Sequence, residues 1–512
     1  MQTPLALGIR GVSITDVVDV ARAGRAVTLD KEAIEAVERS HSTATELISG
    51  NRAVYGLSTG FGFLADRYIE PEHRAVLQVG LVRSHAATVG EEVDSEVVRA
   101  MILLRAATLA KGFSGIRVDL ITGLLALLNH EITPIVREHG SLGCSGDLAP
   151  LAHVALALIG EGDVLDSHGR RSPAARALLE AGLNPLELEA KEGLALTNGT
   201  DGMLAMLSLA CADIGLLLKT ADVAAAMSVE ALEGTDQAFL PELLALRPHP
   251  GQAASAANMT AVLAGSGIVA SHKEGDTRVQ DAYSLRCAPQ VLGAARDTLD
   301  HATTVVEREL ASAIDNPVVL PDGRVASCGN FHGAPLAYVA DFLAIALADS
   351  ASISERRIDR LLDPTRSHGL PAFLAADPGV DSGLMLAQYS AAALVADSRR
   401  LAAPASVDNI PTSAMQEDHV SMGWAAAYKL RRVVTDFAGV LAIELMTSSR
   451  AVELRAPHAP APASRAVLDG VRQQVPGVGP DRYLAPELDL MTGMVTSGQI
   501  VAWAESATGP LR

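Results

Sequence analysis

Ser145 lies in a glycine-rich segment where either a side chain or the backbone itself could do chemistry. Residues 140–151 read Gly-Ser-Leu-Gly-Cys-Ser-Gly-Asp-Leu-Ala-Pro-Leu, and Asp147 and Pro150 are typical of the start of a helix. Three interpretations compete: a nucleophile elbow, a tight start of a helix, and a backbone that cyclises. A nucleophile elbow has the pattern G-x-S-x-G after a strand. Here Asp147 replaces the last glycine of that pattern, and no strand-like run precedes Ser145.

Cyclisation of the backbone would explain the residue types around Ser145. The amide nitrogen of Gly146 would attack the carbonyl carbon of Cys144, and only a residue without a Cβ lets the backbone bend that tightly. Ser145 would then lose its hydroxyl group and leave an exocyclic methylene. Only the carbonyl of Cys144 joins the ring, so its side chain is predicted to be a spectator. The product would be an electrophile that no encoded side chain supplies.

The segment is one of several motifs that together resemble a known family. The others, in chain order, are Tyr55-Gly-Leu-Ser-Thr-Gly-Phe-Gly, Lys191-Glu-Gly-Leu-Ala-Leu-Thr-Asn-Gly-Thr, Arg278-Val-Gln-Asp-Ala-Tyr-Ser-Leu-Arg-Cys-Ala-Pro-Gln, Gly329-Asn-Phe-His, Ser354-Glu-Arg-Arg and Gln416-Glu-Asp-His-Val-Ser-Met-Gly. Over nearly the whole chain, they resemble the aromatic amino acid ammonia-lyases. In that family an Ala-Ser-Gly segment loses two waters to form 4-methylidene-imidazol-5-one (MIO). The resemblance implies that Cys144, Ser145 and Gly146 form MIO here, without a metal or pyridoxal phosphate.

The resemblance also implies roles for one residue in each of three motifs. Tyr55 resembles the family's lid tyrosine and is the candidate general base for the β-proton, a role that needs surroundings favouring the phenolate. Asn198 is expected to hydrogen-bond MIO or the substrate carboxylate, and Phe331 to pack against MIO or the substrate. Without the motifs, these residues would be interpreted as a loop aromatic, an Asn-Gly turn and a core phenylalanine.

A second group of candidates follows Arg278. Tyr283 and Arg286 are three residues apart and would share one face of a helix. Arg286 carries a planar guanidinium that suits a bidentate contact, so we expect it to bind the substrate α-carboxylate. Tyr283 is expected beside the methylidene group and Gln280 is expected to orient the ring or the carboxylate. The alternative for Arg286 is an internal salt bridge.

Two residues indicate the substrate. His85, in the run Arg-Ser-His-Ala, and Glu417 match the histidine-specific branch of the family. A carboxylate facing the substrate can orient an imidazole, stabilise its charged form or assist proton transfer, and a polar site discriminates against apolar analogues. Met415 departs from the family, which more often has asparagine there. The resemblance therefore implies non-oxidative deamination of L-histidine to urocanate and ammonia, the first step of histidine breakdown.

Two other functions remain possible from the sequence. One is a lyase or aminomutase of the same family that acts on tyrosine or phenylalanine, against which His85 and Glu417 argue. The other is a catalytically silent helical scaffold, against which Tyr55 and the intact segment 144–146 argue.

Composition limits the partners and the compartment. The 512 residues carry a formal net charge of -19, which argues against nucleic acid or an anionic membrane surface as a partner. The four cysteines are scattered, and the histidines show no metal-binding spacing. No uninterrupted apolar run reaches membrane-spanning length, and residues 1–10 lack the pattern of a secretory signal. We expect a cytoplasmic enzyme.

Hydrophobic periodicity predicts a mainly α-helical fold. Helices are expected at residues 30–49, 95–111, 118–129, 291–313, 335–362, 383–402 and 419–453. The charged run 352–357 is interpreted as structural. The resemblance implies a long-helix bundle of the ammonia-lyase or fumarase-aspartase type with a mixed N-terminal lobe, assembled as a homotetramer with shared active sites. The expected parts are a lobe at 1–190 with the tyrosine and prosthetic-group loops, a bundle at 191–455, and a small C-terminal segment at 456–512.

Overall fold

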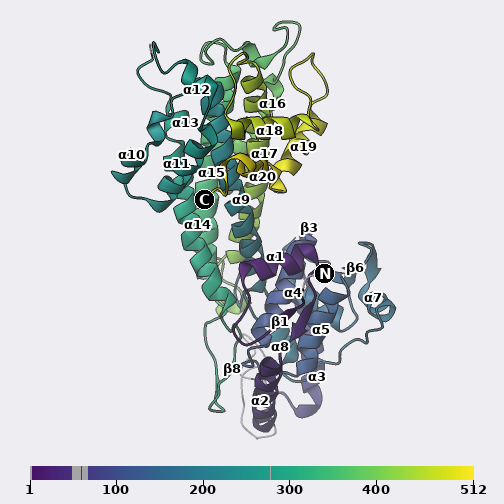
Figure 1. Cartoon of the computed structure of the whole chain (residues 1–512). Coiled ribbons are helices and arrows are strands. Elements are labelled where there is room, and N and C mark those ends of the chain that lie inside the picture. Colours follow the sequence, from purple (N-terminus) through teal and green to yellow (C-terminus); the bar gives the residue numbers. More distant parts are fainter. Residues whose placement is uncertain (1–2, 49–58, 60–66, 277) are drawn as a thin grey trace. The chain divides into compact units, whose positions relative to one another are not determined.

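The computed structural model describes residues 3–48, 59, 67–276 and 278–512, and Figure 1 shows the chain with its elements labelled. The chain divides into two compact units, each assembled from segments that are distant in sequence. Unit 1 comprises Met1–Ala212, Thr303–Asp341 and Pro404–Tyr428. Unit 2 comprises Asp213–Ala302, Phe342–Ala403 and Lys429–Arg512. The three-part division expected from the sequence stays a prediction.

Unit 1 combines short strands with helices. Its helices before residue 200 are α1 (Ile14–Ala23), α2 (Lys31–Ile48), α3 (Pro71–His85), α4 (Ser95–Leu109), α5 (Val118–Asn129), α6 (Leu148–Leu158), α7 (Ala174–Glu180) and α8 (Glu192–Thr197). Strands β1 (Leu5–Leu7) and β2 (Val27–Leu29) pair in parallel, with Leu5 opposite Val27. The other sheets are antiparallel and pair β3 (Val89–Glu92) with β5 (Arg137–His139), β4 (Thr133–Pro134) with β6 (Asp163–Leu165), β6 with β7 (Arg171–Pro173), and β8 (Val318–Val319) with β9 (Val325–Ala326).

The core of unit 1 is centred on α4, which is apolar on nearly all sides. From Val97 to Leu109 every residue except Arg99 is buried, as expected of a helix surrounded by other elements. Helices α1 and α5 both pack against α4 (Figure 1). Arg99 donates hydrogen bonds to the carbonyls of Val20 and Ala21 and so satisfies free acceptors in the last turn of α1.

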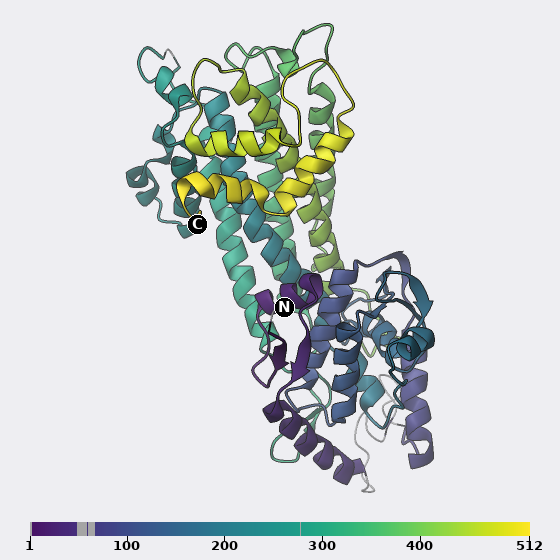
Figure 2. The ribbon, with the colours of Figure 1, turned by 45° about the vertical axis from the view of Figure 1, so that its right-hand side comes forward.

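Unit 2 contains the larger parts of four long helices. These are α9 (Asp201–Ala231), α14 (Ala288–Leu310), α15 (Ala334–Leu362) and α17 (Gly423–Glu453). Shorter helices complete the unit: α10 (Pro241–Ala245), α11 (Pro250–Leu263), α12 (Gly267–Ser271), α13 (Tyr283–Arg286), α16 (Met385–Leu401), α18 (Pro462–Arg472), α19 (Ala485–Thr496) and α20 (Gln499–Thr508). Helices α18 and α20 lie side by side, which both views show (Figures 1 and 2).

A buried charge cluster connects three of the long helices inside unit 2. Glu444 on α17 accepts hydrogen bonds from Ser228 on α9 and from Ser354 and Arg357 on α15. The side chains of Arg357 and Glu444 are fully buried, with Nε 2.6 Å from Oε1. Ser354 and Arg357 in the run 352–357 therefore make structural contacts, and the partner of Arg357 lies on another helix of the same chain.

The predicted helices are confirmed with small shifts of their ends. The prediction for 118–129 matches α5, whereas the helix expected over 419–453 begins only at Gly423. The mainly helical fold is confirmed as well. Helices α9 and α15 are long and apolar enough to cross a membrane by length and composition, but 78% and 61% of their most apolar windows are buried. Both fit the description of core helices.

Candidate active site

The predicted prosthetic-group segment forms a tight turn in unit 1 directly before α6. Gly143 and Gly146 have φ values of +74° and +78°, in the left-handed region that favours glycine. A Cβ at position 146 would overlap the carbonyl oxygen of Gly199. That same oxygen accepts a hydrogen bond from the amide of Asp147 at 2.7 Å. The turn is therefore fixed against the segment that follows Asn198, and only glycine fits at its third position.

Asn198 lies beside this turn at the C-terminal end of α8, with a fixed orientation. Its Nδ2 atom donates to Oδ1 of Asp315 at 3.3 Å and to the carbonyl of Asn316 at 2.9 Å. Both neighbouring atoms can only accept, so the amide nitrogen must face them. The Oδ1 atom of Asn198 consequently faces away, and it is buried without a hydrogen-bond partner among the described residues. Such an unsatisfied acceptor is where a ligand or prosthetic group is expected to donate.

Buried charges hold Asn198 and its neighbours in place. Lys191 donates to Oδ2 of Asp315 at 2.7 Å, and both side chains are almost completely buried. Arg105 on α4 donates to the carbonyls of Asn198 and Ile314, each at 2.8 Å. Burial lowers the pKa of Lys191, an effect that the charge of Asp315 opposes. These contacts join the segment that carries Asn198 to residues 314–316.

Glu417 follows a sharply curled loop that returns to the prosthetic turn. Ser413, Ala414 and Met415 all have positive φ, between +53° and +69°. This conformation is sterically unfavourable for residues that carry a Cβ, and asparagine is among those that tolerate it best. The curl pairs the backbones of Thr412 and Glu417, with Thr412 N donating to Glu417 O at 3.0 Å. Met415 is 67% exposed.

The curled loop also brings two hydroxyl groups to one oxygen of Glu417. Thr412 Oγ1 and Ser413 Oγ donate to Oε2 of Glu417 at 3.0 and 2.8 Å. Thr412 Oγ1 in turn lies 3.3 Å from Sγ of Cys144. The structure therefore brings together, within unit 1, the segment Cys144–Ser145–Gly146, Asn198 and Glu417.

Two further predicted residues belong to unit 1 but have fewer described contacts. His85 is the last residue of α3, and its Nδ1 lies 3.1 Å from Oγ of Ser84. Helix α3 packs against α6 and α8, the helices next to the prosthetic turn and Asn198. Phe331 is half-buried in the turn before α15. The next residue, His332, stacks on His419 with ring centroids 5.6 Å apart.

The remaining described candidates belong to unit 2. Tyr283 and Arg286 form the single-turn helix α13, and the guanidinium carbon of Arg286 lies 4.6 Å from the centroid of the Tyr283 ring. The predicted shared face is therefore confirmed. Arg286 Nε donates to the carbonyl of Asp281 at 3.0 Å, which is no salt bridge. Gln280 lines a pocket of about 410 Å³ together with Asp281 and Arg278. Tyr55 lies outside the described residues.

Asp147 is the strongest electrostatic anomaly at the prosthetic turn. Its carboxylate is completely buried and accepts from Ser141 Oγ and from the amide of Met203, each at 2.8 Å. Burial raises the pKa of Asp147 to about 7, helped by the neighbouring Asp201, and the hydrogen bonds oppose part of this rise. A group that titrates near neutrality therefore follows Gly146 directly.

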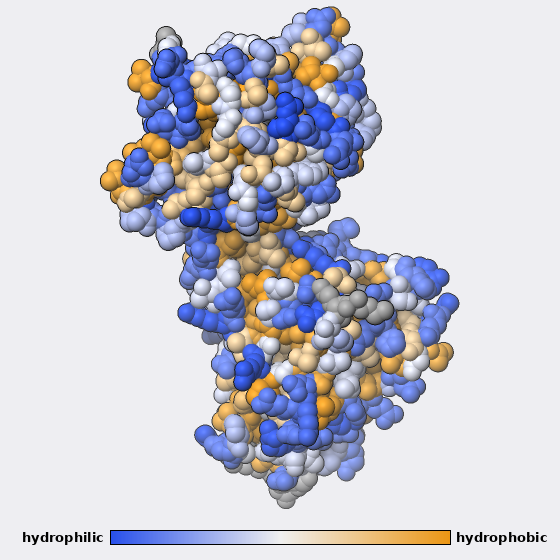
Figure 3. Space-filling view, viewed as in Figure 1, coloured by the Kyte–Doolittle hydropathy of each residue, from blue (hydrophilic) through white to orange (hydrophobic). Residues whose placement is uncertain are grey.

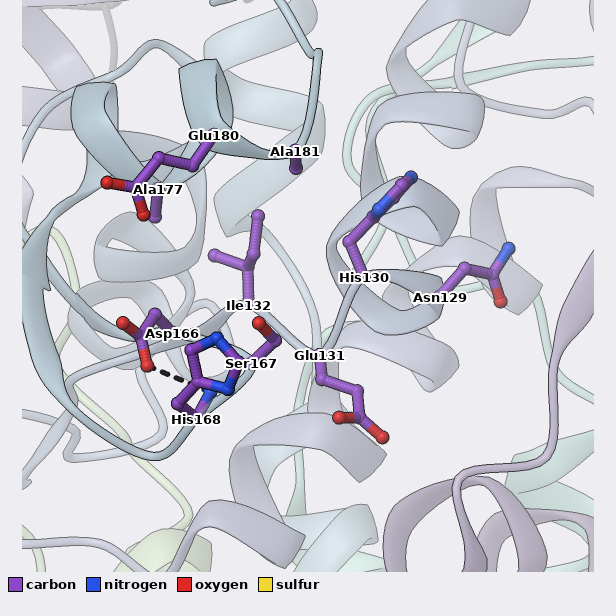
Figure 4. A pocket seen from close by; sticks show the side chains of 10 residues that line it. All are labelled: Asn129, His130, Glu131, Ile132, Asp166, Ser167, His168, Ala177, Glu180 and Ala181. Atoms are coloured by element: carbon purple, nitrogen blue, oxygen red, sulfur yellow. Dashed lines mark hydrogen bonds between the residues drawn. The ribbon is translucent and has the colours of Figure 1, made fainter.

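A pocket of about 380 Å³ lies elsewhere in unit 1 (Figure 4). Figure 4 shows Glu180 and Ala181 on one side of it, His130 on the other, and the hydrogen bond from the backbone of His168 to Asp166. None of the predicted site residues that the structure describes lines this pocket. In the described ranges, no three His, Cys, Asp or Glu side chains cluster closely enough to hold a metal ion.

Sequence reasoning missed several residues that hold the site in place. Thr412 and Ser413 bind Glu417. Lys191 and Asp315 orient Asn198, and Arg105 binds the carbonyl of Asn198. Some of them left a trace in the sequence, since Lys191 begins one quoted motif and Asp315 begins the Asp-Asn-Pro run that ends a predicted helix. Nothing in the sequence indicates that Arg105 is an internal contact.

Comparison with known sequences points to one family. Residues 12–473 match the profile of the aromatic amino acid lyases. The chain is 58% identical to the histidine ammonia-lyase of Streptomyces coelicolor over 99% of both chains. It is 47% identical to the histidine ammonia-lyase of Deinococcus radiodurans, over 97% of this chain and 95% of that protein.

Solved structures share the whole fold. A tyrosine aminomutase from Streptomyces globisporus superposes with a TM-score of 0.94 at 38% identity and 100% coverage of both chains. The histidine ammonia-lyase of Trypanosoma cruzi gives a TM-score of 0.91 at 36% identity, covering 99% of this chain and 96% of the other. The ammonia-lyase fold expected from the sequence is confirmed. The chain belongs to the aromatic amino acid lyase family.

Proposed function

We propose that this protein is a histidine ammonia-lyase, which deaminates L-histidine to urocanate and ammonia without oxidation. The observation that carries the proposal is the carboxylate of Glu417, fixed by Thr412 and Ser413 and linked through Thr412 to the first residue of the prosthetic segment. A carboxylate there suits an imidazole substrate and disfavours an apolar ring. High identity to several histidine ammonia-lyases over the full chain supports the same substrate.

We further propose that Cys144, Ser145 and Gly146 form MIO. The absence of room for a Cβ at Gly146 and the unsatisfied buried oxygen of Asn198 both fit such a group. Once formed, MIO supplies an electrophile for the amino group of the substrate. The Ala-Ser-Gly segment of the family differs from the Cys-Ser-Gly segment of this chain only in the side chain of its first residue. That side chain stays outside the ring.

The chain's own residues would bind the substrate and move its protons. Arg286 has no hydrogen-bond partner for its terminal nitrogens within the described part of the chain, which suits an α-carboxylate ligand. Glu417 and His85 would hold the imidazole, and Asn198 would fix the reacting centre. Phe331, Tyr283 and Gln280 would shape the site around it. Tyr55 would remove the β-proton, and this proposal rests on the resemblance alone.

We also propose a homotetramer with shared active sites in the cytoplasm, with no nucleic acid or membrane partner. Support comes from large apolar side chains left exposed on two helices of unit 2: Phe342 and Ile345 on α15, and Leu386 and Tyr389 on α16. Leu243 on α10 is 49% exposed, and Figure 3 shows apolar surface in the region that Figure 1 labels α10. Light scattering of the purified protein measures the assembly, and a monomer would contradict it.

A tyrosine aminomutase is the second candidate, because a tyrosine aminomutase structure gives the TM-score of 0.94. One experiment separates the two. Near-ultraviolet absorbance is followed with L-histidine, L-tyrosine and L-phenylalanine, using the wild type and Ser145→Ala. We expect urocanate from the wild type alone, and an intact mass two waters below the encoded value in the wild type alone. Turnover of tyrosine in place of histidine would overturn the proposal.

A further inference from the structure

We propose that Cys144 and Thr412 are positioning residues for Glu417, so that the first residue of the prosthetic segment takes part in substrate selection. This inference rests on the proposed function and gives the side chain of Cys144 a role outside the ring, in which it was predicted to be a spectator. It concerns a residue at which this chain departs from the Ala-Ser-Gly pattern of the family.

The contacts form a continuous chain of polar atoms. Sγ of Cys144 lies 3.3 Å from Oγ1 of Thr412, and Oγ1 of Thr412 lies 3.0 Å from Oε2 of Glu417. Ser413 donates to the same Oε2 at 2.8 Å. Both hydroxyl groups therefore bind one oxygen of the carboxylate, and Oε1 is left to accept from a substrate. With an alanine at position 144, this series of polar contacts would end at Thr412.

The direction of the hydrogen bonds follows from the number of available hydrogens. A carboxylate can only accept, so Thr412 must give its single hydroxyl hydrogen to Glu417. Its oxygen can then only accept from the thiol, which requires Cys144 to be protonated. Burial raises the pKa of the Cys144 thiol. The hydrogen bond with Thr412 opposes this rise, and the nearby Glu417 adds to it, so that the pKa stays above its ordinary value. The thiol is therefore a donor at neutral pH, and it polarises the hydroxyl that binds Glu417.

The loop backbone explains why these groups meet. Three successive residues with positive φ, Ser413 to Met415, curl the chain so that Thr412 and Glu417 become backbone partners. Such a conformation persists only when its surroundings hold it. The side-chain hydrogen bonds of Thr412 and Ser413 to Glu417 help to hold it, so removing them would let the carboxylate turn away from the substrate.

The test compares variants by KM and kcat for L-histidine and by the ratio of histidine to tyrosine turnover. We expect Thr412→Val to raise KM about tenfold, the loss of one charge-assisted hydrogen bond, with kcat changed less. Thr412→Ser keeps the hydroxyl and restores KM. Cys144→Ala raises KM about threefold, and Cys144→Ser does not. Thr496→Val, which removes an exposed hydroxyl on α19, is the matched control and leaves both constants unchanged.

A double variant separates positioning from a general structural effect. Because the thiol acts through Thr412, Cys144→Ala is expected to add nothing in the Thr412→Val background, which is a non-additive result. Intact mass confirms that each variant has lost two waters. A KM for Cys144→Ala equal to that of the wild type overturns the inference even if Thr412→Val fails to fold. No urocanate from the wild type overturns the proposed function and this inference together.

Discussion

The side-chain nitrogen of Asn198 faces the carboxylate of Asp315, and this contact determines where the oxygen of Asn198 points. Asp315 in turn accepts from Lys191 on its other oxygen. All three side chains are buried, and among their described polar atoms Oδ1 of Asn198 is buried without a hydrogen-bond partner. A buried ion pair that contributes little net stability thus has a clear effect on orientation.

Changing Asp315 should therefore impair activity more than a distant substitution would. In Asp315→Asn an NH2 group replaces one of the two carboxylate oxygens. Because this group cannot accept a hydrogen bond, either Lys191 or Asn198 loses its acceptor. We expect kcat/KM for L-histidine to fall by about 10- to 100-fold, as expected when a group that orients a substrate contact is lost. Circular dichroism shows whether the variant is folded. A folded variant with full activity would show that Asn198 does not need this orientation.

The sequence predicted the local elements, because these depend on residue type and spacing. The roles of the site residues came mainly from the resemblance to the family and stay predictions. The helix at 118–129 and the shared face of Tyr283 and Arg286 are examples. Contacts between distant segments could not be predicted from the sequence. Cys144 contacts Thr412, which is 268 positions away, and Arg105 contacts Ile314, which is 209 positions away. The interleaved units are likewise a tertiary property, because each buries residues from three separate segments.

Cys144 is expected to react slowly with alkylating reagents at neutral pH. The thiolate is the reactive form, and burial raises the pKa of Cys144 above its ordinary value. Peptide mapping after brief treatment with iodoacetamide should show less modification of Cys144 than of an unstructured cysteine peptide. The rate should rise with pH more strongly between pH 8 and 10 than for that peptide. Equal rates at about pH 7 would contradict the raised pKa.

Removing Arg357 should destabilise unit 2 strongly. Arg357→Met would leave the buried carboxylate of Glu444 without its charged partner, a change that typically costs about 3–5 kcal/mol. Arg465 on α18 provides a matched control, because its side chain is 54% exposed and pairs with Asp469, which is 64% exposed, on the same helix. Arg465→Met should cost at most about 1 kcal/mol. Urea unfolding of both variants measures the difference, and equal losses would contradict a structural role for Arg357.

Asp147 gives the protein a distinctive dependence of stability on pH. The folded-state pKa of Asp147 is raised to about 7, against an ordinary value of 3.8. Between these values the folded protein binds a proton that the unfolded chain does not, so stability falls as pH rises. The contribution of Asp147 is complete below about pH 4 and is lost as pH increases through 7.

An uncharged analogue isolates this contribution from the other buried carboxyl groups. Asp147→Asn can still accept from the amide of Met203 and can donate to Ser141, but it does not titrate. We expect the Tm of the wild type, relative to that of Asp147→Asn, to drop by roughly 2–4 °C between pH 5 and 8. Thermal unfolding at several pH values measures both curves. A constant difference would show that the carboxyl group of Asp147 is already ionised at pH 5 and that its burial is offset by hydrogen bonds.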